Sequence, residues 1–181
     1  VRLLQQYCGS LKGVIVFGIG GAYLTDDGQA AAGLLDICLA EKEYLGDFGV
    51  CFGDRVEPFE NKNITAPYEF LLDQEMTGRA SGLLFEKGIP HSKGNFVTVN
   101  GASGTAARGQ LLRARFDGLC ENMEGAAIAR ACRMFSVPML ELRVISNLVE
   151  DRPGSPWKVT EACQRAAEAV SLIVQGIREV A

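Results

Sequence analysis

The strongest constraint on the fold is a continuous apolar run, GVIVF, at residues 13–17. A strand with one face in water alternates apolar and polar side chains, whereas a strand covered on both faces can be apolar throughout. The run leads into a glycine cluster, GIGGA at residues 18–22, which we interpret as a loop. The chain is therefore predicted to contain a buried parallel strand, as α/β proteins do.

Strand and helix patterns alternate along the rest of the chain. Further strands are predicted at 34–43, 95–99, 119–122 and 139–145. Helices are predicted at 1–8, 105–116, 124–135 and from Ser155 onward, with one more near 68–80 in an otherwise loop-like stretch. This order predicts a single domain over residues 1–181, a three-layer α/β/α sandwich around a mixed, largely parallel sheet.

The composition argues against several classes of protein. Hydrophobic residues make up 48% and charged residues 22% of the chain, which is typical of soluble globular proteins. The net charge of −4 disfavours a general nucleic-acid binder. The sequence shows neither a signal-peptide pattern nor an apolar run near the roughly 20 residues that span a bilayer. We expect a cytoplasmic protein without membrane or nucleic-acid partners.

The six cysteines form no CxxC pair, and His91 is the only histidine that could join them as a metal ligand. Neither a zinc site nor a disulfide framework is predicted, and the cysteines are interpreted as small reduced apolar residues. His91 itself is interpreted as a surface-loop residue, and Trp157 as an anchor into the core. No metal or organic cofactor is expected.

Ligands of open α/β sheets bind beyond the carboxyl ends of the strands. Three places satisfy this rule: residues 18–22, residues 100–105, and the pair formed by Glu124 and Asn147. Because all three follow predicted strands, they are expected to converge on one cleft.

Glu124 lies where a predicted strand gives way to a helix. A carboxylate in the first turn is stabilised by the helix dipole, and this role alone could explain it. An ionised carboxylate can also accept two hydroxyl hydrogen bonds. That chemistry suits the 2′- and 3′-hydroxyls of a ribose, and a sugar that becomes cationic in the transition state.

Asn147 ends the predicted strand LELRVIS. It could be an ordinary turn residue, since asparagine tolerates left-handed backbone. Its amide also carries both a donor and an acceptor, so it can meet a 6-oxopurine at N7 and O6. An aspartate in its place would suit a 6-aminopurine.

Several of these segments together resemble the nucleoside phosphorylase/nucleosidase superfamily: GIGGAY at 18–23, NMEGAA at 122–127, VP at 137–138 and RVISN at 143–147. The methylthioadenosine/S-adenosylhomocysteine nucleosidases have a related helix start but an aspartate where this chain has Asn147. The asparagine version, followed by LVEDR and Trp157, is most similar to the futalosine hydrolases of the alternative menaquinone pathway. Those enzymes release hypoxanthine, a 6-oxopurine.

The resemblance implies a role for each matching residue. Glu124 would hold the ribose hydroxyls and stabilise the oxocarbenium-like transition state, and Asn147 would bind the purine. The remaining predicted contacts are Met123 against the sugar, Gly20 and Gly21 on the ribose and water side, Ala102 and Ser103 at the base, and Phe48 near a partner's pocket in a homodimer or higher homo-oligomer.

Members of this superfamily activate water with a glutamate that follows their first strand. The sequence offers no counterpart, so the resemblance implies that residues 1–181 lack the family's N-terminal strand region and cannot be assigned a general base.

The favoured function is hydrolysis of the N-glycosidic bond of a 6-oxopurine nucleoside, with futalosine cleaved to hypoxanthine and dehypoxanthine futalosine. A purine nucleoside phosphorylase would need an anion site, and the arginines nearest the glycine cluster in sequence are Arg2, Arg55 and Arg79. An adenine-specific nucleosidase is disfavoured by Asn147. A non-catalytic nucleoside-binding protein is the alternative that the missing glutamate predicts.

Overall fold

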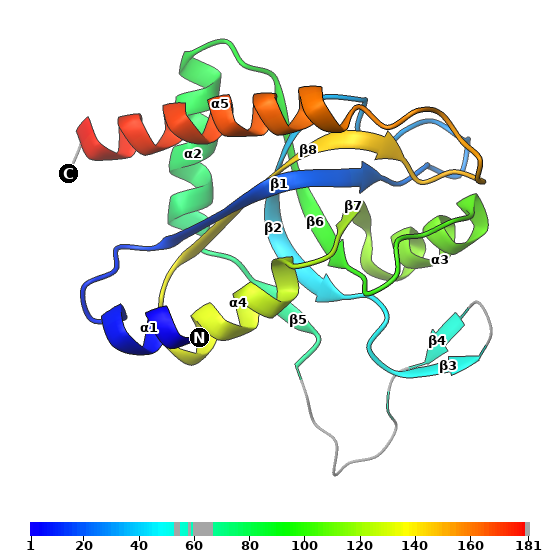
Figure 1. Ribbon diagram of the computed structural model, residues 1–181, viewed down its shortest axis with the longest axis horizontal. Coiled ribbons are helices and arrows are strands. Elements are labelled where there is room, and N and C mark those ends of the chain that lie inside the picture. The colour runs from blue at the N-terminus through cyan, green and yellow to red at the C-terminus, as the bar shows by residue number, and fades with distance from the viewer. Residues whose placement is uncertain (53–54, 58, 60–66, 180–181) are drawn as a thin grey trace.

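The computed structural model describes residues 1–52, 55–57, 59 and 67–179 (Figure 1). Its strands are β1 (Val14–Ala22), β2 (Ile37–Leu45), β3 (Val50–Phe52), β4 (Arg55–Glu57), β5 (Glu69–Leu71), β6 (His91–Thr98), β7 (Gly118–Asn122) and β8 (Met139–Leu148). Its helices are α1 (Arg2–Tyr7), α2 (Gln74–Glu86), α3 (Ala106–Phe116), α4 (Gly125–Met134) and α5 (Val159–Glu179).

The main sheet is mixed and curls until it closes on itself. Its strand order is β5-β2-β6-β7-β1-β8, and β2 pairs with β8 as well, from Ile37 with Val144 to Leu39 with Leu142. The long pairings, β1 with β8 and β2 with β6, are parallel, as is β6 with β7. The antiparallel pairings, including β1 with β7, are shorter. β3 and β4 form a separate hairpin.

Apolar side chains cover both faces of the central strands. In the GVIVF run itself, Val14 and Val16 join one core cluster and Ile15 joins the other, but Phe17 is 49% exposed, so the burial predicted for this run fails at its last residue. In β2, Ile37 and Leu39 join a core cluster with α2 and α5, whereas Cys38 and Ala40 join a second cluster with α4 and α1. Successive side chains of a strand point to opposite faces, so a strand buried on both sides needs this uninterrupted apolar pattern. Figure 1 shows α5 and α2 on one side of the sheet and α4 on the other.

The glycine cluster is part of β1, and its interpretation as a loop is wrong. β1 pairs with β8 from Val14 to Ala22, with a register shift between Gly20 and Gly21. A side chain at Gly18 would come within 2.9 Å of the Arg143 guanidinium, and one at Gly21 within 3.0 Å of the Asn147 amide. The glycines therefore let functional side chains approach the strand, and they do not break it.

The C-terminal helix begins later than Ser155. The backbone N–H of Ser155 donates to the carboxylate of Glu150 at 2.6 Å, so Ser155 belongs to a loop and does not cap the helix. The N–H of Lys158 then donates to the Ser146 carbonyl, which ties the chain to β8 just before α5 starts. Among the described residues, none of the helices combines the length and apolarity needed to cross a bilayer.

His91 is the first residue of β6, so its interpretation as a loop residue is also wrong. Its ring bonds to the Ser81 hydroxyl at 2.7 Å and to the Ile89 carbonyl at 3.1 Å. These contacts give it a local structural role between α2 and β6.

Thr105 caps α3, which corresponds to the helix predicted at 105–116, with its hydroxyl accepting from the Arg108 N–H at 3.2 Å. Replacement by alanine, Thr105→Ala, should lower the free energy of unfolding by about 1 kcal/mol, because one N–H of the first turn loses its partner. Urea unfolding measures the change. Thr105→Ser retains the hydroxyl and should retain most of the stability; equal losses for the two variants would contradict the capping role.

Candidate functional site

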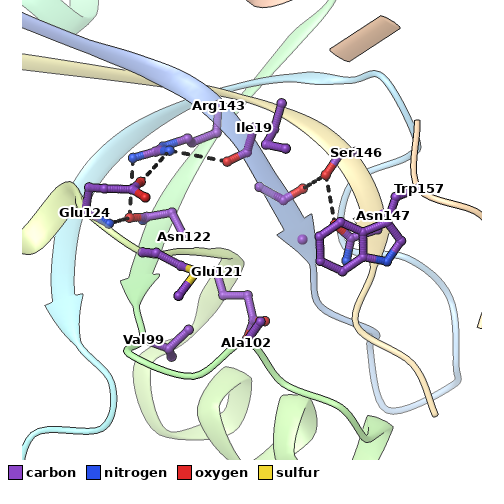
Figure 2. Close-up of a pocket in the computed structure, with 13 residues that line it drawn as sticks. Ile19, Val99, Ala102, Glu121, Asn122, Glu124, Arg143, Ser146, Asn147 and Trp157 are labelled. Atoms are coloured by element: carbon purple, nitrogen blue, oxygen red, sulfur yellow. Dashed lines mark hydrogen bonds and ion pairs between the residues drawn. The ribbon is translucent and has the colours of Figure 1, made fainter. Parts of the chain in front are cut away.

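A cavity of about 230 Å³ opens near the last residues of β1, β7 and β8. Figure 2 shows side chains from these strands, and from the segments that follow β6 and precede α5, around the same space. Its lining residues are Ile19, Gly20, Gly21, Val99, Ala102, Glu121, Asn122, Met123, Glu124, Arg143, Ser146, Asn147 and Trp157. The cavity thus contains both Glu124 and Asn147, as the sequence predicts.

Glu124 directs its carboxylate to Arg143 and away from its own helix. It occupies the N-cap position of α4 but makes no side-chain cap bond. Its Oε2 accepts from Arg143 Nη1 at 3.0 Å, while its side chain remains 58% exposed. The helix-dipole explanation of Glu124 is therefore incomplete, because the carboxylate is held by a guanidinium at the cavity.

Asn122 is the residue that caps α4. Its Oδ1 accepts from the N–H groups of Glu124 and Gly125 at 3.0 and 2.8 Å, and Arg143 Nη2 lies 3.4 Å from the same oxygen. The first turn of a helix leaves several N–H groups without partners. The Asn122 amide accepts from two of them, and it thereby fixes the position of Glu124 at the start of α4.

Arg143 is almost completely buried between two carboxylates. Besides Glu124, it contacts Glu141, whose Oε1 accepts from Nε at 2.9 Å, and its Nη1 also donates to the Ile19 carbonyl at 3.3 Å. Burial alone would lower the pKa of the guanidinium, but the charges of Glu141 and Glu124 raise it. Arg143 is therefore a permanent cation inside the fold.

Asn147 lies within β8, where the predicted turn residue would have ended the strand. The Ser146 hydroxyl donates to its Oδ1 at 2.8 Å, and its Nδ2 donates to the Leu148 carbonyl at 3.2 Å. These bonds orient the amide and leave the second Nδ2 hydrogen for a ligand. Trp157 lies beside Asn147 in Figure 2.

Glu121 adds a second carboxylate to the cavity. Its two oxygens accept from the backbone N–H and the hydroxyl of Ser103, at 2.8 and 2.7 Å. Burial raises the pKa of Glu121, and the Ser103 bonds act in the opposite direction. Tyr23 packs nearby with a buried hydroxyl, and burial and the charge of Glu121 raise its pKa well above the ordinary value.

The structure brings most of the predicted site residues together. Met123, Gly20, Gly21 and Ala102 line the cavity with Glu124 and Asn147. Ser103 is buried and reaches the cavity through Glu121. Phe48 is outside the lining and packs edge-on against Phe59, with ring centroids 5.4 Å apart.

Sequence reasoning missed four contributors: Asn122, Glu121, Arg143 and Trp157. Trp157 was assigned to the core, but it is 45% exposed and lines the cavity, with the Arg152 guanidinium 4.8 Å above its ring. The available signal was a charged pair inside an apolar strand: Glu141 and Arg143, two residues apart, point to the same face of β8.

Replacing Arg143 by methionine tests the buried ion pairs. Arg143→Met leaves Glu141 buried without its cation, so the free energy of unfolding should fall by about 3–5 kcal/mol. The loss should shrink as the pH is lowered, because protonation of Glu141 removes the unpaired charge. Chemical denaturation at several pH values measures both effects.

Arg130→Met is the matched control, because Arg130 is on the exposed face of α4. It should change stability by no more than about 0.5 kcal/mol. Similar losses for the two variants would mean that the guanidinium of Arg143 is not needed to compensate Glu141.

Comparison with known proteins agrees with this geometry. The family model of the Phosphorylase superfamily matches residues 1–178. A futalosine hydrolase from Acidothermus cellulolyticus is 32% identical over 161 residues, covering 88% of this chain and 63% of that protein. A second, from Thermus thermophilus, is 32% identical over 163 residues, covering 86% of this chain and 66% of that protein. The chain thus spans less than two thirds of the length of these relatives.

Solved structures share the fold. Futalosine hydrolase of Helicobacter pylori superposes with a TM-score of 0.79 at 18% identity, covering 96% of this chain and 73% of that one. The methylthioadenosine/S-adenosylhomocysteine nucleosidase of the same organism, solved with butyl-thio-DADMe-Immucillin-A, gives the same TM-score, identity and coverage. On the match over residues 1–178, the chain belongs to the phosphorylase superfamily.

Proposed function

We propose that this protein hydrolyses the N-glycosidic bond of a 6-oxopurine nucleoside, with futalosine as substrate and hypoxanthine as the released base. The observation that carries the proposal is the presence of Glu124 and Asn147 in one cavity. The first supplies a carboxylate for a sugar, and the second an amide for a purine. The futalosine hydrolases among the relatives support the choice of substrate.

The sugar end of the site is Glu124. Oε2 accepts from Arg143, and the side chain makes no other hydrogen bond among the described residues. Its remaining acceptor capacity suits the 2′- and 3′-hydroxyls of a ribose. Positive charge develops on the sugar as the bond to the base breaks, and a fixed carboxylate stabilises that charge. Met123 is 52% exposed at the cavity and would pack against the sugar.

The base end of the site is Asn147. Its unused Nδ2 hydrogen can donate to O6, and its Oδ1 can accept from N7 once the leaving base gains a proton there. A carboxylate in this position would repel O6. Glu121 supports the same preference, because a carboxylate can accept the N1–H that a 6-oxopurine carries and a 6-aminopurine lacks.

In the proposed reaction, electron density from the C1′–N9 bond passes into the purine, and water attacks C1′ from the opposite face. A carboxylate acting as general base would take the proton of that water, which is worth roughly 10²–10⁴-fold in rate. The described residues are assigned no such base. Their proposed work is to hold the ribose, bind the leaving purine and stabilise the charge between them.

A phosphorylase is the second candidate, because Arg143 brings a cation to the glycine segment. The sequence argument counted arginines near this segment along the chain and missed Arg143, which the fold brings close. Arg143 Nη1 lies 3.3 Å from the Ile19 carbonyl oxygen. Arg143 is nevertheless paired with Glu124 and Glu141, so its charge is already compensated. A phosphate dianion would have to compete with two carboxylates, which favours hydrolysis.

Further properties are proposed with the activity. The helices on both sides of the curled sheet fit a three-layer α/β/α arrangement. The family resemblance favours a homodimer or higher homo-oligomer, with Phe48 near the contact. Free cysteines such as Cys38 and Cys120 fit a reducing cytoplasmic location.

Product analysis tests the proposed reaction. The full-length protein is incubated with futalosine, inosine or methylthioadenosine, with and without phosphate, and the released base is separated by chromatography. We expect hypoxanthine from futalosine at a rate independent of phosphate. A strict requirement for phosphate would identify the protein as a phosphorylase. Release of adenine would identify it as an adenine-specific nucleosidase, and binding without turnover would identify it as a non-catalytic nucleoside-binding protein.

Two substitutions test the two ends of the site. Glu124→Gln should lower kcat/KM roughly 10²–10³-fold, because the charge that stabilises the cationic sugar is lost. Asn147→Asp should lower oxopurine release roughly 10²-fold, because O6 faces a carboxylate. Glu168→Gln, on an exposed position of α5, should leave the rate unchanged. Wild-type rates in both site variants would refute the assignment.

A further inference from the structure

Two carboxyl groups that the proposed reaction does not use lie directly behind the Arg143 ion pair. Glu43 of β2 and Glu141 of β8 are both 0% exposed. Arg143 contacts Glu141 and Glu124, and Glu43 lies beside Glu141, so three carboxyl groups share one nearby guanidinium. An unpaired charge in a protein interior is strongly unfavourable, so this set is not expected to carry three negative charges.

Glu43 is held by neighbouring strands through both of its oxygens. The Thr98 hydroxyl of β6 donates to Oε2 at 2.8 Å, and the Asn122 amide of β7 donates to Oε1. The other face of the same Asn122 amide caps α4 and contacts Arg143. Glu43 is therefore connected, through one side chain, to the start of the helix that carries Glu124.

Glu141 leaves one oxygen without a partner. Its Oε1 accepts from Arg143 Nε at 2.9 Å, but its Oε2 is buried and has no hydrogen-bond donor in the described part of the chain. A Cβ added to Gly125 would collide with Glu43 Oε1 and with Glu141 Oε2. The two carboxyl groups thus face each other across a space that only glycine leaves open.

A proton on Glu43 would satisfy the orphaned oxygen. The carboxylic acid would donate from Oε1 to Glu141 Oε2 while its oxygens still accept from Thr98 and Asn122. Burial, and then the charge of Glu141, raise the pKa of Glu43 well above its ordinary value. Burial also raises the pKa of Glu141, but the charge of Arg143 opposes this shift, so Glu43 is the group that keeps the proton.

We propose that Glu43 and Glu141 share one proton and act as a positioning pair, which keeps Arg143 directed at Glu124 and thereby fixes the carboxylate at the cavity. The catalytic consequence rests on the proposed function, whereas the effect on folding does not. The other titratable groups around Glu43 are Glu124, Arg143 and Cys120, and burial raises the pKa of the Cys120 thiol, which remains neutral.

The pair makes stability depend on pH with a definite sign. The unfolded chain releases the Glu43 proton near its ordinary pKa of 4.5. The folded state raises this pKa, so the folded protein still holds the proton above pH 4.5. Stability is therefore greatest below that pH and falls as the pH rises toward the folded pKa. Glutamine at position 43 cannot ionise, and its amide can donate to Glu141 as the protonated acid does. Its amide nitrogen cannot accept from Asn122, and the loss of that bond is independent of pH.

The first test compares the Tm of Glu43→Gln with that of the wild type between pH 5 and pH 8. The variant's Tm relative to wild type should rise by roughly 3–5 °C per pH unit while the pH lies below the folded pKa of Glu43. Glu86→Gln, the same change at an exposed position of α2, should show a difference that does not vary with pH. A pH-independent difference for Glu43→Gln would overturn the shared proton.

Glu141→Gln tests which of the two carboxyl groups holds the proton. It removes the ionised carboxylate from Arg143, so it should lower the Tm more than Glu43→Gln does at pH 7. Equal losses for the two variants would contradict the assignment of the proton to Glu43. Should Glu43→Gln unfold, the pH dependence of the wild type compared with Glu43→Asp supplies the same test, because a shorter acid cannot reach Glu141 in the same way.

The second test measures kcat and KM for futalosine against pH. Ionisation of Glu43 should lower wild-type kcat/KM at alkaline pH, because Glu124 both binds the ribose and stabilises its charge. Glu43→Gln should keep its kcat/KM there. If the wild type and Glu43→Gln are both active and their rates depend on pH in the same way, the positioning role is overturned. Absence of any nucleosidase activity, together with a pH-dependent Tm difference, would refute the proposed function while leaving the proton-sharing pair intact.

Discussion

One buried guanidinium joins the parts of the candidate site. Arg143 reaches from β8 to the Ile19 carbonyl of β1, to Glu124 at the start of α4 and to Asn122 at the end of β7. A charge this deep is stabilised by Glu141, two residues away on the same strand face, and by Glu124. Because strand alternation places both side chains on one face, this ion pair lies within β8 itself.

The glycines of β1 make that arrangement possible. Gly18 leaves room for the guanidinium, and Gly21 leaves room for the Asn147 amide. A larger residue at either position would push a functional side chain away from the strand to which it is packed. The same small residues explain why the segment was mistaken for a loop: glycine weakens a strand by itself, and here pairing with β8 along its whole length compensates.

Local patterns in the sequence predicted the positions of helices and strands better than they predicted which strands pair with one another. The GVIVF run and the helix patterns at 105–116 and 124–135 are short-range features, and β1, α3 and α4 formed close to where they were expected. The closure of the sheet by β2 and β8 depends on contacts about a hundred residues apart, for which a single sequence carries no direct signal. Ser155 was misplaced for a related reason, since its N–H is taken by Glu150.

In the candidate site, too, the sequence predicted individual residues better than the contacts between them. Glu124 and Asn147 were identified from their chemistry and their places after strands, and both line the cavity. Arg143, Asn122 and Glu121 were missed because their roles are relations between side chains that only folding brings together. Glu43 shows this most clearly: in the sequence it is one acid in a charged strand, and in the fold it faces Glu141 in the interior.

Trp157 gives the molecule an optical property of its own. It is the single tryptophan of the chain, and it lines the cavity with 45% of its surface in water. Indole emission shifts to shorter wavelength when water leaves the ring. A purine settling beside Asn147 would therefore change the intrinsic fluorescence of the protein, so occupancy could be followed in solution without a label or a coupled reaction.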